Sequence, residues 1–182
     1  MKKIVGALLV VLALGSTETA FAFNGERQGF LMGLGIGVSS CKVENRDSRV
    51  GLETDLKIGY GFTNQFQLFY TNKVNFSSAE GDDSGLAVHG LTGIGANYYF
   101  SPEAPSFFVG GGVGLASDYL ISTDSDDDTD SHSGTGYYLN GGFEFARHWN
   151  VELSVIRDSI DYGGSENKGA WTFMVTINAL AY

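Results

Sequence analysis

The chain has 182 residues, a formal net charge of −10 at neutral pH, 26 glycines and two prolines. Its length suits one domain, and its acidity excludes a protein that binds the phosphate backbone of nucleic acids. Cys41 is the only cysteine, which excludes an internal disulfide.

The N-terminus has the features of an export signal. Lys2 and Lys3 precede an apolar run over residues 4–14, and the small residues Ala20 and Ala22 stand at positions that a signal peptidase recognises. We therefore expect a signal peptide over residues 1–22 and one domain over residues 23–182. Because two lysines and Glu18 leave with the signal, the net charge of the exported chain changes from −10 to −11.

Residues 49–62 alternate apolar and polar side chains with the period of a β-strand. The apolar face carries Val50, Leu52, Leu56, Ile58, Tyr60 and Phe62, and the other face carries Gly51, Glu53, Asp55, Lys57, Gly59 and Gly61. A soluble protein turns such an apolar face toward its core. An outer-membrane barrel turns it toward lipid and keeps the charges in the lumen.

The same alternation predicts eight strands, at residues 29–39, 49–62, 66–76, 86–100, 107–116, 135–146, 149–156 and 170–182. Tight turns at 63–65, 101–106 and 147–148 alternate with longer polar loops at 40–48, 77–85, 117–134 and 157–168. Short turns at one end and long loops at the other are typical of bacterial outer-membrane barrels, whose short turns are periplasmic.

The sequence therefore predicts an all-β protein, an eight-stranded antiparallel up-and-down transmembrane β-barrel in the cell outer membrane, and we expect a monomer. The alternative is a soluble barrel of lipocalin type. It would leave the face with Gly51, Glu53 and Asp55 outside and does not explain the inner-face glycines, which suit a narrow lumen.

Aromatic residues gather beside the tight turns and the C-terminus, where they would form a girdle at one membrane interface. The expected girdle consists of Tyr60, Phe62, Phe66, Tyr98, Phe100, Phe107, Phe143, Phe145, Trp149 and Tyr182.

The glycine-rich segment 93–116 (GIGANYYFSPEAPSFFVGGGVGLA), the export signal and the terminal Tyr182 resemble the small outer-membrane barrels of the OmpA, OmpX and OmpW type. The resemblance implies outer-membrane lipid and lipopolysaccharide as surroundings and the barrel assembly machinery as a partner during insertion. Leu180 and Tyr182 have the opposite parity to Trp171 and Phe173, so we expect either a bulge near residues 178–179 or an end that leaves the barrel.

Six charged residues share the inner parity: Glu53, Asp55, Lys57, Lys73, Glu144 and Glu152. Charges enclosed in a narrow barrel are costly unless they are paired, so we expect the two lysines to meet carboxylates among Glu53, Asp55, Glu144 and Glu152. Such a network either plugs the barrel or lines a gated ion path. The plug is favoured, because eight strands enclose little more than side chains.

An acidic run in the loop 117–134 contains Asp124, Asp126, Asp127, Asp128 and Asp130. The EF-hand pattern fails there, since Thr129 and Thr135 stand where that loop needs glycine and glutamate. The run is either a solvated acidic tip or a divalent-cation site at Asp124, Asp126, Asp128 and Asp130. Such loops also suit an extracellular ligand with a basic surface.

A lipid-modifying enzyme would need a serine activated by a histidine on the lipid-facing surface. The histidines are His89, His132 and His148, and none stands in a His-x-Ser pair on a lipid-facing strand. We expect no cofactor and no catalytic residue, and a membrane-structural or surface-interaction role. A narrow channel for ions or small solutes is the main alternative.

Overall fold

The computed structural model describes residues 26–44, 48–78, 85–122, 131–161 and 168–182. The predicted signal peptide and the acidic run 124–130 lie outside these ranges. In the described part of the chain, no helix is long and apolar enough to cross a membrane.

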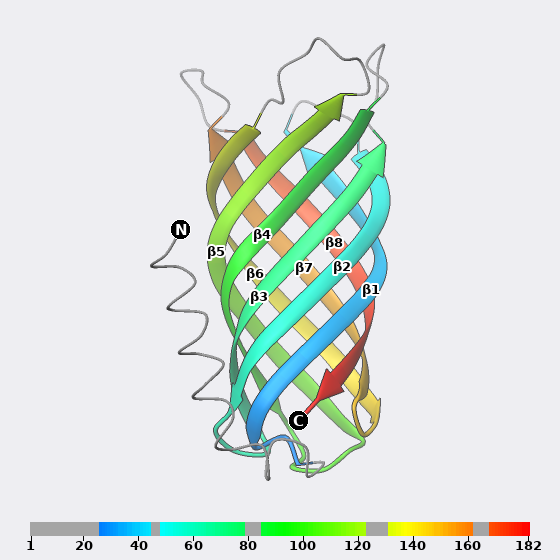
Figure 1. Cartoon of the computed structure of the whole chain (residues 1–182), viewed down its shortest axis with the longest axis vertical. Helices are drawn as coiled ribbons and strands as arrows, with labels where there is room; N and C mark the ends of the chain where they lie inside the picture. Colours follow the sequence, from blue (N-terminus) through cyan, green and yellow to red (C-terminus); the bar gives the residue numbers. More distant parts are fainter. Residues whose placement is uncertain (1–25, 45–47, 79–84, 123–130, 162–167) are drawn as a thin grey trace, which may run out of the picture.

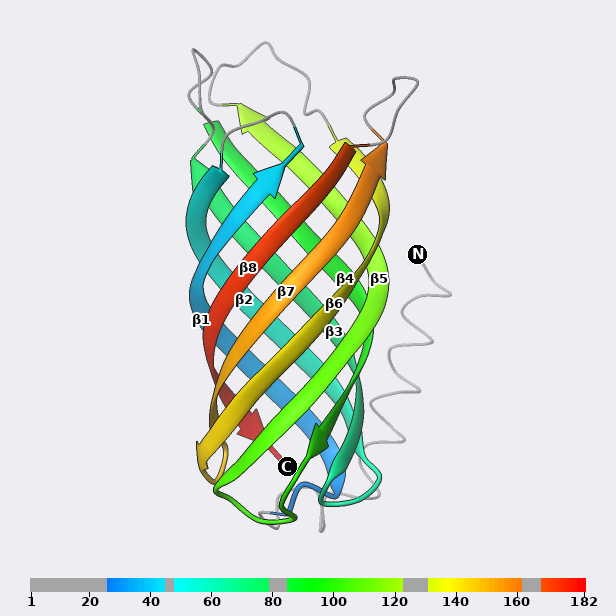
Figure 2. The ribbon, with the colours of Figure 1, turned by 180° about the vertical axis from the view of Figure 1, so that it is seen from behind.

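Eight antiparallel strands follow one another around a closed barrel, in the order of the chain (Figures 1 and 2). They are β1 (Gly29–Val43), β2 (Ser48–Gly61), β3 (Phe66–Ser78), β4 (Gly85–Tyr99), β5 (Ser106–Ser122), β6 (Ser131–Ala146), β7 (Trp149–Asp161) and β8 (Lys168–Ala181). The predicted fold class is confirmed.

The strands are strongly tilted. Met32 on β1 pairs with Ile58 on β2, and the pairing can be followed from strand to strand around the barrel. The path reaches Trp171 on β8, which pairs with Lys42 back on β1. One circuit thus ends ten residues further along β1. This offset is the shear of the barrel, and it fixes the strand tilt and the narrow bore of eight strands.

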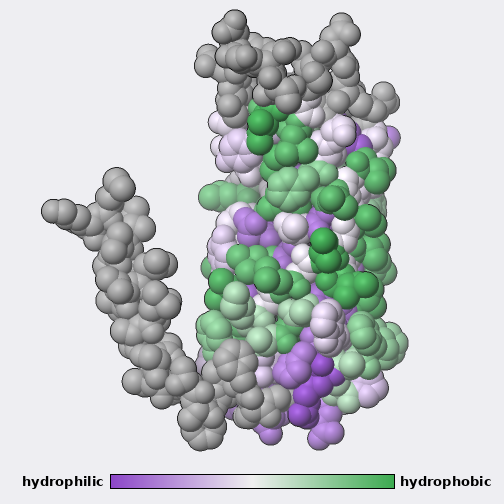
Figure 3. Space-filling model, turned by 45° about the vertical axis from the view of Figure 1, so that its right-hand side comes forward, coloured by the Kyte–Doolittle hydropathy of each residue, from purple (hydrophilic) through white to green (hydrophobic). Residues whose placement is uncertain are grey.

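Alternation along each strand separates a lipid-facing from an interior face. The outer face carries exposed large apolar side chains such as Ile36, Leu52 and Leu139, which are 66%, 62% and 65% exposed. Figure 3 shows hydrophobic side chains along one side of the barrel, with hydrophilic ones between them and gathered at the lower end. The interior is lined by charged, amide and hydroxyl side chains together with three small apolar clusters.

Several strands extend beyond the predicted limits. β1 continues to Val43, β5 to Ser122 and β7 to Asp161, so the predicted loops at 40–48, 117–134 and 157–168 were too long. Polar residues in these stretches indicate loops, but strand pairing continues through them. Polar strand ends fit a barrel whose loop-bearing end leaves the lipid.

The end of β8 corrects a second expectation. Its pairing with β1 and β7 is regular through Ala179, so there is no bulge near residues 178–179 and the strand does not leave the barrel. Leu180 and Tyr182 instead face the interior, where they are 5% and 1% exposed. Tyr182 is therefore not part of the membrane girdle. The irregularity in register lies in β6, between Glu144 and Ala146.

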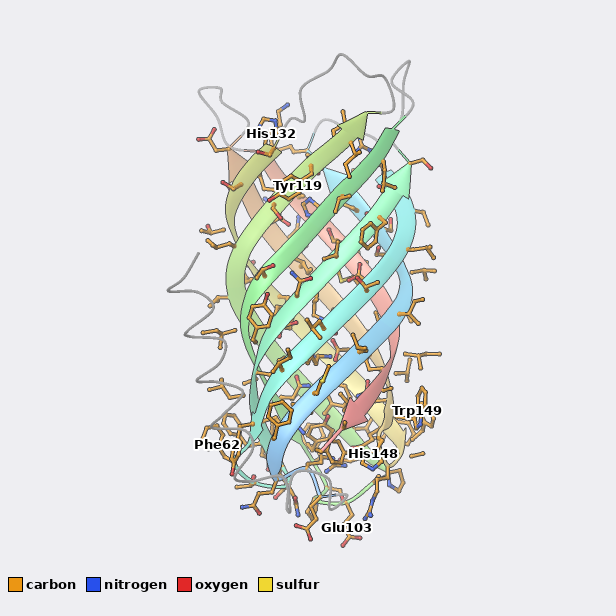
Figure 4. All side chains as sticks on the ribbon, viewed as in Figure 1. Phe62, Glu103, Tyr119, His132, His148 and Trp149 are labelled. Atoms are coloured by element: carbon orange, nitrogen blue, oxygen red, sulfur yellow. The ribbon has the colours of Figure 1, made fainter. Side chains whose placement is uncertain are left out.

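The other expected girdle residues lie on the outer face near the short turns. Phe62 and Trp149 mark this end in Figure 4, with Tyr119 and His132 at the opposite, loop-bearing end. Phe107 and Phe143 stack there with ring centroids 4.6 Å apart.

Two interior glycines make room for one large ring. A Cβ atom at Gly95 or at Gly112 would collide with the side chain of Tyr138, which is itself 1% exposed. Glycine is therefore required where the Tyr138 ring crosses the narrow bore.

Candidate functional site in the barrel interior

Four charged side chains form a closed ring of ion pairs halfway along the bore. Lys57 Nζ lies 2.8 Å from Asp55 Oδ2 and 2.7 Å from Glu152 Oε2. Lys73 Nζ lies 2.7 Å from the same Asp55 oxygen and 2.8 Å from Glu152 Oε1. Each lysine contacts both carboxylates, and the four charges cancel. We call Asp55, Lys57, Lys73 and Glu152 the charge quartet.

Strand geometry brings the quartet together from two sides of the barrel. Asp55 and Lys73 are directly opposite each other on β2 and β3. Glu152 reaches them from β7, across the bore. The quartet thus ties distant strands together through the lumen, and its side chains are at most 3% exposed.

Neighbouring groups complete the hydrogen bonding of the quartet. Thr71 Oγ1 donates to Asp55 Oδ1 at 3.2 Å, and Ser154 Oγ donates to Glu152 Oε1 at 2.8 Å. The Lys73 ammonium lies 5.2 Å from the centroid of the Tyr138 ring, within cation–π distance. A buried charge is tolerated when its partners are this complete.

Two of the six predicted lumen charges lie outside the quartet. Glu53 is fully buried toward the loop-bearing end, and neither of its carboxylate oxygens has a hydrogen-bond partner among the described residues. Glu144 lies toward the short turns and pairs with Arg27 rather than with a lysine.

Arg27 closes the bore at the turn end. Its Nε donates to Glu144 Oε2 at 2.6 Å, and its Nη1 donates to the backbone oxygens of Asn64 and Ser101 at 3.0 and 2.8 Å. The guanidinium also stacks 4.1 Å from the centroid of the Tyr99 ring. Because Arg27 precedes β1 and is 2% exposed, the chain folds under the barrel to place it there.

An apolar layer lies beside this closure. It consists of Leu31, Phe69, Leu180 and Tyr182. The hydroxyl of Tyr182, just beyond β8, donates to Glu144. Burial raises the pKa of Tyr182 to about 12, and its hydrogen bond to Glu144 acts in the same direction. The phenol therefore stays protonated at neutral pH and remains a donor.

The loop-bearing half of the interior is arranged around His89. Its Nε2 lies 3.0 Å from Asp158 Oδ2, and its Nδ1 lies 3.7 Å from Asp118 Oδ1. A cavity of about 10 Å³ borders His89, Asp118 and Asn75. This volume holds about one water molecule. We call Glu53, His89, Asp118 and Asp158 the upper acidic cluster.

Sequence reasoning missed Arg27, His89, Asp118 and Asp158 as interior residues. Arg27 precedes the first strand, where parity carries no information. The predicted loops include Asp118 and Asp158, although the alternation of β5 and β7 continues into them. Among the described residues, no group of three or more histidines, cysteines or acidic residues is arranged to hold a metal ion. The expected cation site at Asp124, Asp126, Asp128 and Asp130 lies outside the described ranges.

Comparison with solved structures supports the fold. The attachment invasion locus protein Ail of Yersinia pestis matches with a TM-score of 0.56 and 14% identity, over 84% of this chain and 99% of that one. Neisserial surface protein A matches with a TM-score of 0.58 and 13% identity, over 84% and 97%. The outer membrane enzyme PagL matches with a TM-score of 0.51 and 13% identity, over 82% and 98%.

One structure of Ail contains the heparin analogue sucrose octasulfate. At these identities the similarity concerns the fold alone. The comparison with curated protein sequences gave no match.

The family comparison is more direct. The model of the outer membrane protein beta-barrel domain matches residues 7–178, almost the whole chain. The protein therefore belongs to the outer membrane protein beta-barrel domain family and resides in the cell outer membrane.

Proposed function

We propose that the protein is a non-conducting, non-enzymatic outer-membrane barrel that acts by binding a basic partner at its loop-bearing end. The observation that carries this proposal is the double closure of the bore. An ion would have to pass the charge quartet and then the layer of Arg27, Tyr99 and Tyr182.

The closure is costly to open. Moving Lys57 or Lys73 out of the ring leaves two buried carboxylates to share one cation, which costs several kcal/mol. Opening the turn end would also break the bonds of Arg27 to Glu144 and to two backbone oxygens. A channel that conducts at rest would be blocked by the charge quartet and by the Arg27 closure.

The loop-bearing end supplies the binding surface in this proposal. The segments that join the strands there carry acidic residues in the sequence, most densely at 124–130. Acidic loops on a rigid barrel attract basic partners, and such electrostatics mainly sets the association rate. The heparin analogue bound to Ail concerns a ligand of opposite charge, so we base the choice of partner on this chain's own sequence.

Planar-bilayer recording tests the closure. We expect wild-type protein, with insertion verified, to give no discrete current steps. Lys57→Met and Glu53→Gln serve as comparison variants. Steps in the wild type whose size or ion preference shifts in these variants would establish the narrow channel instead.

Binding of a poly-lysine peptide tests the loops. Protein in lipid nanodiscs should bind poly-lysine in a salt-sensitive way, with poly-glutamate as the control peptide. Replacing the aspartates at 124, 126, 127, 128 and 130 by asparagine should abolish most of this binding while leaving the barrel folded. Unchanged binding by the replaced protein would contradict the assignment to these loops.

A further inference from the structure

Arg157 is an ordered cation on the outer face of the barrel. It lies on β7, pairs with outward-facing Tyr137 and Trp171, and has its guanidinium 5.1 Å from the centroid of the Trp171 ring. Its Nη1 donates to the backbone oxygen of Ala170 at 3.3 Å. A Cβ atom at Gly169 would collide with both Nη atoms, so the glycine lets the guanidinium lie flat against β8.

The height of Arg157 matches the outer interface of the membrane. Trp149, on the same face of β7, belongs to the aromatic residues at the turn end. Arg157 lies eight positions after Trp149, and on a strand tilted by roughly 40° this is a rise of about 20 Å along the barrel axis. The apolar band of such barrels is about 25 Å tall. A long arginine side chain reaches the head groups from this position.

A second cation continues this surface. Lys42 pairs with Trp171 from β1 and is exposed, so Trp171 is flanked by two cations. Within the described ranges, neither Arg157 nor Lys42 forms an ion pair. Glu44, just beyond the end of β1, has its Oε2 3.5 Å from the backbone nitrogen of Gly169.

Arg157 also borders a groove on the lipid-facing surface. The groove has a volume of about 900 Å³ and crosses β4 to β7. Its walls are apolar at Ile94, Val113 and Leu115, and its polar lining includes Thr135, Ser159 and Arg157, together with Asp158, which is 2% exposed. This volume is at the upper end of the range of ligand pockets. The aliphatic part of the lining suits the apolar chain of an amphiphile, and the polar part suits its head group.

We propose that this outer face binds a phosphate-bearing lipid of the outer leaflet. An acyl chain lies in the groove along Val113 and Leu115, and the phosphate lies between Arg157 and Lys42. The guanidinium fork suits a phosphate and offers two parallel hydrogen bonds. The bilayer supplies this ligand wherever the protein resides. The site is on the opposite side of the barrel wall from the charge quartet, so it is independent of the proposed function.

Native mass spectrometry of the detergent-solubilised full chain tests the proposal. The probe is bisphosphorylated lipid A, compared with the same lipid after removal of its phosphates. We expect retention of the phosphorylated form, about fivefold weaker in Arg157→Gln and about 25-fold weaker in Arg157→Gln/Lys42→Gln. Glu44→Gln should strengthen retention. Arg147→Gln, at an exposed turn on the other end, is the matched control and should change nothing.

A second pair of variants tests the groove without changing charge. Leu115→Trp fills the groove and should reduce retention of lipid A, whereas Leu34→Trp, on β1 outside the groove, should not. Both positions are exposed on the outer face, at 67% and 60%, so both variants should fold. Equal retention of the dephosphorylated lipid, or equal effects of Arg157→Gln and Arg147→Gln, would overturn the proposal. A lipid-free dimer broken by Leu115→Trp would assign the face to a second copy of the chain instead.

Discussion

The charge quartet and the upper acidic cluster are both buried in the same bore, but they solve the problem of buried charge differently. In the quartet, two lysines and two carboxylates alternate at 2.7–2.8 Å and the charges cancel. In the upper acidic cluster, one histidine lies 3.0 Å from the Asp158 carboxylate and 3.7 Å from the Asp118 carboxylate. The third, Glu53, has no hydrogen-bond partner among the described residues.

This difference separates a structural element from an adaptable one. Complete pairing makes the quartet rigid, because removing any member leaves a buried charge behind. The upper acidic cluster borders a cavity of about one water molecule and lies nearer the loops, so its groups can exchange partners with solvent. Substitutions in the two regions should therefore have very different effects on stability.

Lys73→Met should give the largest effect. It leaves the Asp55 and Glu152 carboxylates to share one lysine, and we expect a loss of about 3–5 kcal/mol in the free energy of unfolding. Urea titration in lipid vesicles, followed by tryptophan fluorescence, measures it.

The charge-balanced variant Lys73→Met/Asp55→Asn is its control. It keeps the Lys57–Glu152 pair, which spans 2.7 Å, and should recover much of the lost stability. A loss below about 1 kcal/mol in the single variant, or a double variant as unstable as the sum of its parts, would contradict a tightly coupled ring.

His89→Leu should have an intermediate effect. It removes the partner of the Asp158 carboxylate, and hydrogen bonds to charged groups contribute about 1.5–3 kcal/mol. A double-mutant cycle separates the two aspartates, because coupling to Asp158→Asn should exceed coupling to Asp118→Asn, in line with the shorter distance. Equal coupling would mean that the histidine moves freely between them.

The predictability of these two regions from sequence differs for a physical reason. Alternation is a local property, so residues 49–62 alone place Asp55 and Lys57 in the bore. The meeting of these residues with Glu152 depends on the register of the strands around the barrel and on the shear of the barrel, which no short segment encodes. The sequence predicts the members and limits the lysines' partners to four carboxylates, but it does not tell that Asp55 and Glu152 are the two that close the ring.

The missed residues follow the same rule. Asp158 continues the inner parity of β7, but a polar residue at a strand end also looks like a loop residue. The sequence predicts Tyr182 in the membrane girdle because aromatic residues at a barrel end normally face lipid. Here the interior is itself apolar at that end, around Leu31 and Phe69, so hydrophobicity no longer distinguishes the inside from the outside.

Glu53→Gln should give the smallest effect, and one of opposite sign. A buried carboxylate without a hydrogen-bond partner costs stability, so its neutral amide should leave the free energy of unfolding unchanged or raise it by up to about 1 kcal/mol. Glu152→Gln is the isosteric comparison in the quartet and should be strongly destabilising, since both lysines lose a partner. Equal losses in the two variants would mean that Glu53 has a cation partner of its own in the membrane. The two regions would then solve the problem of buried charge in the same way, by complete pairing.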